Sequence, residues 1–99
     1  MTDVQKHISN YLDDCKYMKG LSSKTIKAYS IDLRQFAEFC ADRLWNEKET
    51  IEEYIKAQYS KSKPKTAKRK IACLKAFFRY LENNDLIVSS PFHKITIKR

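Results

Sequence analysis

Residues 63–81 read KPKTAKRKIACLKAFFRYL and combine an apolar stripe with the densest positive charge in the chain. The apolar side chains recur at intervals of four, three, four and three residues, which places them on one face of an α-helix: Ala67, Ile71, Leu74, Phe78 and Leu81. Basic side chains lie on an adjacent face of the same helix: Lys65, Lys68, Lys75 and Arg79. The pattern predicts a helix that buries one face and presents a basic face to solvent.

The charge of this region is unbalanced, because residues 61–79 contain eight Lys and Arg but no Asp or Glu. The formal net charge of the chain is +8. Residues 1–50 carry eight basic and eight acidic side chains, whereas residues 51–99 carry twelve and four. Such an excess indicates a partner such as nucleic acid, an anionic membrane or an acidic protein, and a merely solvated surface is the alternative.

Two helices are expected in the first half of the chain. Residues 3–19 follow a helical apolar pattern that begins with a possible capping box at Thr2 and Gln5. Gly20, the only glycine, is expected to end this helix in the left-handed conformation. A second helix should begin at about Ser23, capped by the serine before it.

The third helix is expected to be short. Residues 44–49 are interpreted as a connection in which the Trp45 side chain packs into the bundle. A capping box that begins at Thr50 follows it. Pro64 suits the first turn of the last helix, and the polar residues 83–85 should end it. Four amphipathic helices with short connections predict an all-α fold, a small four-helix bundle.

Composition predicts one domain that folds alone, since the 99 residues include 42% hydrophobic side chains. Cys15, Cys40 and Cys73 fall at apolar helical positions, and no histidine lies at ligand spacing from them. We therefore expect three buried thiols in a reducing cytoplasm, with no disulfide, metal or other cofactor. No apolar run is long enough for a membrane span or a targeting segment.

No enzyme active site is predicted. Four tyrosines lie on or beside apolar stripes, where the ring is usually part of the core: Tyr11, Tyr29, Tyr54 and Tyr80. The acidic pairs at residues 13–14 and 52–53 are adjacent in sequence, so their side chains diverge on a helix and cannot share a substrate. A single glycine cannot form a phosphate-binding loop.

The second helix is also basic, but only over its first half. Lys24, Lys27 and Arg34 lie opposite its apolar stripe. Residues 22–25 read SSKT, and their hydroxyls and the free amides of a helix N-terminus can hold a phosphate. Because unbalanced charge occupies two separate helices, nucleic acid is favoured over a solvated surface.

Two stretches resemble a known family. Residues 11–40, YLDDCKYMKGLSSKTIKAYSIDLRQFAEFC, are similar to its first helix and its S-x-x-T-x-x-x-Y-x-x-D-L-x-x-F helix. Residues 66–95, TAKRKIACLKAFFRYLENNDLIVSSPFHKI, are similar to its long basic helix and following turn, with Ser90 where Asn often precedes the proline. The family is the N-terminal core-binding, SAM-like domain of tyrosine recombinases, including phage integrases and Xer-type proteins. The resemblance covers nearly the whole chain and implies an orthogonal bundle.

In that family the domain forms one half of a C-shaped clamp around duplex DNA near the crossover site, and a larger C-terminal domain carries the catalytic residues. The resemblance therefore implies a DNA-binding domain over residues 1–90, a linker starting over residues 91–99, and no catalysis by this chain. It also implies a monomeric isolated domain and a parent integrase or recombinase that assembles as a tetramer on DNA. Periodicity and resemblance together give the candidate DNA contacts: Ser23, Lys24, Thr25, Lys27, Arg34, Lys65, Thr66, Lys68, Arg69, Lys75 and Arg79.

A second function remains open at this point. A stand-alone basic helical module that binds an acidic protein would form a one-to-one complex and respond little to DNA. A helix-turn-helix regulator is disfavoured, because no short glycine-containing turn joins two helices of that motif's length with a basic second helix.

Overall fold

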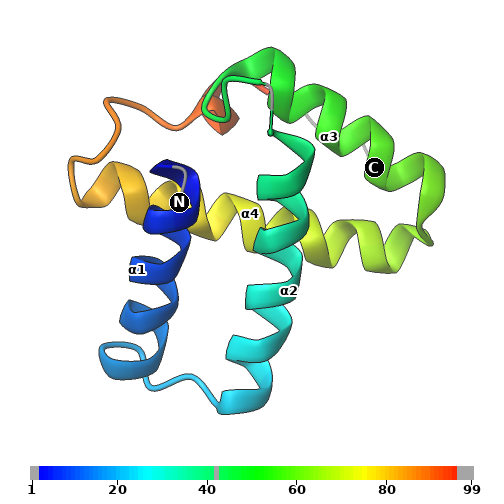
Figure 1. Ribbon diagram of the computed structural model, residues 1–99. Coiled ribbons are helices and arrows are strands. Elements are labelled where there is room, and N and C mark those ends of the chain that lie inside the picture. Colours follow the sequence, from blue (N-terminus) through cyan, green and yellow to red (C-terminus); the bar gives the residue numbers. More distant parts are fainter. Residues whose placement is uncertain (1–2, 42, 96–99) are drawn as a thin grey trace.

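The computed structural model describes residues 3–41 and 43–95. Four α-helices follow one another, and a short 3₁₀ helix comes after them: α1 Asp3–Tyr17, α2 Ser23–Phe39, α3 Lys48–Lys61, α4 Pro64–Asn83 and η1 Pro91–Lys94. No strand occurs among these described residues. The α-helices lie in an orthogonal arrangement, with α1 and α2 side by side across the long α4, and α3 on the side of α4 away from the α1–α2 loop (Figure 1). The predicted all-α four-helix bundle is confirmed.

The core forms because α4 contacts each of the other helices. All five residues of its predicted apolar stripe are buried, together with Cys73 and Phe77 beside the stripe. Phe78 lies at the centre, fully buried, with its ring centroid 5.6 to 6.0 Å from those of four other aromatic rings. One of these rings belongs to Trp45, which is half-buried against the core as predicted.

The predicted helix ends on either side of the α1–α2 loop are confirmed. Gly20 has a φ of +63°, and the amide of Leu21 donates to the carbonyl of Cys15 at 3.0 Å, which folds the chain back onto α1. Ser22 caps α2 by accepting a hydrogen bond from the amide of Thr25 at 3.2 Å. The capping box expected at Thr2 lies outside the described residues.

The start of the third helix was predicted wrongly. The helix begins at Lys48 rather than after Thr50, because the amide of Ile51 donates to the carbonyl of Glu47 at 3.1 Å. Thr50 therefore lies inside the first turn, and its side chain is buried rather than capping the helix. The helix has 14 residues and is the shortest of the four α-helices in the described part of the chain, in keeping with the expected short helix.

The segment expected to begin a linker stays packed on the domain through Ile95. Ser90 caps η1 by accepting a hydrogen bond from the amide of Phe92 at 3.2 Å. Pro91 is buried, and the ring of Phe92 packs 5.8 Å from that of Phe78. Residues 96–99 lie outside the described part of the chain, so the linker role stays a prediction.

The three cysteines are buried, as the sequence predicted. Burial raises the pKa of Cys40 to about 11 and the pKa of Cys73 to about 12. Because the thiolate is the reactive form, we expect native protein to react with DTNB far more slowly than protein in guanidinium, in which all three thiols should titrate. Rapid labelling of a thiol in the native protein would contradict this placement in the core.

Candidate nucleic-acid interface

The predicted contact residues lie at the surface of α2 and α4. The lysine and arginine side chains among them are all exposed, as is Ser23, while Thr25 and Thr66 are partly buried. Apart from the buried Asp32, the acidic residues of these two helices are Glu38 and Glu82, each close to a helix C-terminus. The remaining exposed surface of both helices is therefore basic or neutral.

The two helices are joined where α2 crosses α4. Arg69 on α4 donates from Nη1 to Oδ2 of Asp32 on α2 at 2.6 Å. One residue further along α4, Lys70 donates from Nζ to Oε1 of Gln35 at 2.8 Å. Arg69, predicted as a DNA contact, thus already has an anionic partner within the protein. Sequence reasoning did not single out Asp32, although it is the Asp of the S-x-x-T-x-x-x-Y-x-x-D-L-x-x-F pattern, and the structure buries it between the exposed Ile31 and the buried Leu33.

The crossing brings together basic residues that are distant in sequence. Lys24 and Lys27 precede Asp32 by eight and five residues, about 12 and 8 Å along the axis of α2. Lys65 precedes Arg69 by one turn, about 6 Å along α4. Figure 1 shows the N-terminal halves of α2 and α4 leaving this crossing in different directions. We call the candidate residues on either side of this crossing the crossing surface and define it by nine residues: Ser23, Lys24, Thr25, Lys27, Arg34, Lys65, Thr66, Lys68 and Arg69.

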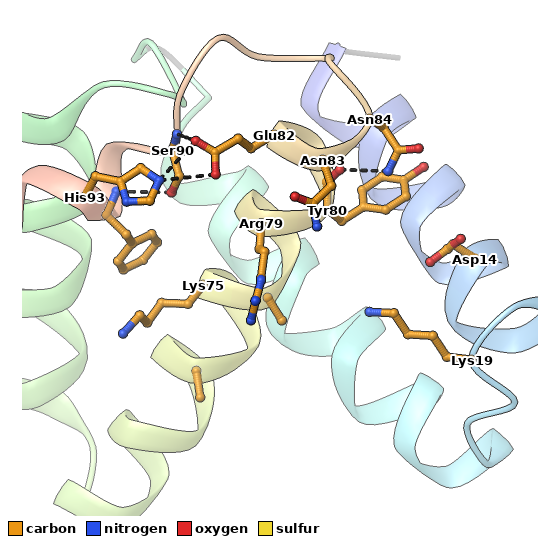
Figure 2. Close-up of a pocket in the computed structure, with 13 residues that line it drawn as sticks. Asp14, Lys19, Lys75, Arg79, Tyr80, Glu82, Asn83, Asn84, Ser90 and His93 are labelled. Atoms are coloured by element: carbon orange, nitrogen blue, oxygen red, sulfur yellow. Dashed lines mark hydrogen bonds and ion pairs between the residues drawn. The ribbon is translucent and has the colours of Figure 1, made fainter.

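Lys75 and Arg79 lie beyond the crossing, on the C-terminal half of α4. They line a hollow whose floor includes Ala72 and Ala76. Figure 2 shows both side chains projecting from α4, with Lys19 reaching toward the hollow from the α1 side. The predicted site is thus divided into the crossing surface and this hollow. Lys19 was not predicted, and no sequence signal placed the end of the first helix beside α4.

The N-terminus of α2 is less available to a phosphate than the sequence indicated. The hydroxyl of Ser22 donates to Oγ1 of Thr25 at 3.0 Å and also accepts the Thr25 amide. Both hydroxyls therefore take part in capping the helix. Ser23, which is exposed, is the better placed of these residues for an external anion.

The tyrosines predicted to be structural do lie in or against the core. Tyr11 and Tyr54 are buried, and Tyr29 and Tyr80 are half-buried against it. Burial raises the pKa of all four hydroxyls, so they stay protonated at neutral pH. This environment opposes the formation of a phenolate nucleophile.

Glu82 holds the chain after α4 in place at the edge of the hollow. Its carboxylate accepts the backbone amide of Ser90 at 3.1 Å and lies 3.0 Å from Nε2 of His93 (Figure 2). The hydrogen bond from His93 and that from the Ser90 amide lower the pKa of Glu82. These contacts anchor η1 to the end of α4.

This anchor should be sensitive to acid. A carboxyl group whose pKa is lower in the folded state stabilises the fold above its unfolded pKa of about 4.3, and that contribution is lost as the pH falls through the folded value. We expect Glu82→Gln to lower the Tm slightly at neutral pH, and the difference from wild type to shrink in acid. Thermal unfolding at a series of pH values measures this, with Glu38→Gln on α2 as the matched control. A difference that persists unchanged into strong acid would contradict the role given to Glu82.

No helix within residues 3–41 and 43–95 is both long and apolar enough to cross a membrane.

Comparison with known proteins finds similarity to one part of tyrosine recombinases. Residues 8–85 match the model of the phage integrase N-terminal SAM-like domain. A tyrosine recombinase of Agathobacter rectalis is 46% identical over 99 residues, which cover 98% of this chain and 32% of that protein. Tyrosine recombinase XerC of Thermodesulfovibrio yellowstonii is 38% identical over 93 residues, covering 92% of this chain and 31% of the relative. The chain therefore spans about a third of the length of these curated relatives. No solved structure is matched significantly.

Proposed function

The chain belongs to the phage integrase N-terminal SAM-like domain family, and from this premise we propose that it is the duplex-DNA-binding part of a site-specific tyrosine recombinase. The observation that carries this proposal is the crossing surface, where two helices that meet at Asp32 and Arg69 both carry exposed cations. Neutralised phosphates supply most of the affinity of such surfaces for DNA. The names of the similar proteins support recombination as the process.

In this proposal the domain grips the duplex near the crossover site during integration or recombination. Strand cutting and rejoining would then be carried out by the part of the recombinase that corresponds to the remaining two thirds of the relatives. The buried, protonated tyrosines of this chain are consistent with that division of labour.

Binding should depend strongly on salt. We expect the affinity for a short duplex to be micromolar or weaker at physiological salt, with a slope of log affinity against log salt of about −4 to −5, from about four to six neutralised phosphates. Fluorescence anisotropy at several salt concentrations gives both quantities. A chain that ignored duplex DNA but formed a one-to-one complex with an acidic protein would support the alternative function instead.

A single charge reversal on the crossing surface should weaken binding to every duplex. Lys68→Glu removes one phosphate contact and adds repulsion, so the salt slope should fall in magnitude by about one or more. Lys6→Glu is the matched control, since this exposed residue lies early in α1, away from α2 and α4 in sequence. Circular dichroism checks that both variants fold. Equal losses from the two variants would mean that only net charge matters, and the proposed binding surface would have to be abandoned.

A further inference from the structure

The pair formed by Asp32 and Arg69 differs from the rest of the crossing surface. The Asp32 side chain is 4% exposed, whereas the Arg69 side chain is 51% exposed, and the two meet at 2.6 Å. The guanidinium is therefore tied at Nη1 to a buried carboxylate, while much of the side chain faces solvent. A guanidinium has five N–H donors, so others remain for an acceptor outside the protein.

The charge of Arg69 is largely compensated by Asp32. A net-neutral pair contributes little to the attraction of phosphates, which depends on uncompensated cations such as the exposed Lys68. The remaining N–H donors of the Arg69 guanidinium, however, are held in a fixed direction by its bond to Asp32. A side chain already held in place also loses less conformational freedom on binding than a free lysine does. Donors that point in a fixed direction and carry little net charge suit the neutral acceptors of a base edge better than they suit a charged phosphate.

The position of Arg69 suits such a contact. It lies at the crossing itself, and exposed cations lie within five residues of Asp32 or Arg69 along the two helices: Lys27 and Arg34 on α2, and Lys65 and Lys68 on α4. Lysines on both helices can contact the backbone on the two sides of a groove, which fixes the register of the duplex without reading its sequence. The second bond between the helices, from Lys70 to Gln35, further stiffens the crossing.

We propose that Arg69 is a sequence-reading residue that donates two hydrogen bonds to O6 and N7 of a guanine in the major groove, and that Asp32 is the residue that positions it. The inference rests on the proposed DNA-binding function. Arginine presents a planar fork that matches these two acceptors, whereas lysine does not. Asp32 does not touch the DNA in this arrangement, because its side chain is buried.

The test uses a short duplex selected by the wild-type chain from a randomised library. Each guanine is then replaced in turn by 7-deazaguanine, which keeps base pairing and phosphates but removes the N7 acceptor. We expect one position at which the replacement weakens wild-type binding at least about fivefold. Arg69→Lys, which keeps the charge beside Asp32, should bind the unmodified duplex more weakly and lose that penalty. Lys68→Ala, the matched control, should keep the penalty while its salt slope falls in magnitude.

Asp32→Asn separates positioning from a purely structural role. With its carboxylate gone, Arg69 becomes an uncompensated and less constrained cation, so the 7-deazaguanine penalty should shrink while the salt slope steepens by about one. A role limited to stability would lower the Tm but leave the penalty and the slope of the folded protein unchanged. That result would overturn the role of Asp32, and a penalty that persists in Arg69→Lys would overturn the role of Arg69.

The absence of a penalty at every guanine in the wild-type protein would also overturn the inference. In that case the salt-dependent binding would still support the proposed function. Failure to bind any duplex would instead remove the proposed function and this inference together. The inference therefore fails in a way that can be distinguished from failure of the function on which it rests.

Discussion

Alanine in place of Phe78 is expected to lower the free energy of unfolding by about 3–5 kcal/mol. The side chain is fully buried, and its ring packs against the rings of Phe36, Phe77, Trp45 and Phe92. Its removal leaves a cavity bordered by α2, α4, η1 and the α2–α3 connection, which cannot all close in at once. Since small domains are stable by only about 5–15 kcal/mol, the variant should lose a large share of the stability of the domain.

Urea unfolding followed by circular dichroism measures this loss. The matched control is Val88→Ala, because Val88 is 101% exposed and its change should stay within about 0.5 kcal/mol. A loss of less than about 1 kcal/mol for Phe78→Ala would mean that the site collapses freely. The central position given to Phe78 would then be wrong.

The apolar pattern of the sequence was sufficient to predict the helices and the core. In α4 the spacing of Ala67, Ile71, Leu74, Phe78 and Leu81 identified a face that is indeed buried. The spacing of apolar residues predicts burial well within a helix, because the face on which a side chain lies depends only on the position of its residue along that helix. Local chemistry also predicted the loop at Gly20 and the cap at Ser22, since each acts on neighbouring backbone groups.

Where the prediction failed, distant packing decided the outcome. Thr50 has the sequence of a helix cap, yet its side chain is buried and the helix starts before it. Residues 91–95, expected to begin a linker, are also held on the domain because Phe92 packs on Phe78, and the linker role of the remaining segment stays a prediction. Both outcomes depend on apolar surfaces of other helices, which local motifs do not contain.

The exposure of the candidate basic residues could be predicted from the sequence, but their arrangement could not. Exposure of Lys24, Lys27 and Lys68 follows from helical period alone. The pairing of Asp32 with Arg69 joins positions 37 residues apart and depends on where α2 crosses α4. For the same reason, sequence alone could not separate Lys75 and Arg79 from the crossing surface. The tertiary structure therefore divides the predicted basic residues between the crossing surface and the hollow, which have different surrounding residues.

Reversing one charge on each side of the crossing should have the largest effect on DNA binding. In the double variant Lys24→Glu with Lys65→Glu, both helices lose a phosphate contact and each gains a repulsive carboxylate. A slope of about −0.9 per neutralised phosphate makes each contact worth nearly tenfold in affinity at 0.1 M salt, relative to 1 M. We therefore expect affinity at 0.1 M salt to fall at least about 60-fold, and further through the added repulsion, and the slope to weaken by about two. Anisotropy titrations with the same duplex measure both.

The matched variant Lys75→Glu with Arg79→Glu makes the same change in net charge in the hollow beyond the crossing. Lys75 and Arg79 follow Arg69 by six and ten residues, about 9 and 15 Å along α4, so a duplex centred on the crossing should reach them less fully. We expect this variant to lose affinity too, but by a smaller factor than the crossing pair. Because net charge is equal in the two variants, long-range attraction cannot produce a difference between them. An equal or greater loss from the hollow pair would move the centre of the interface to the C-terminal half of α4, with Lys19 as its neighbour on α1.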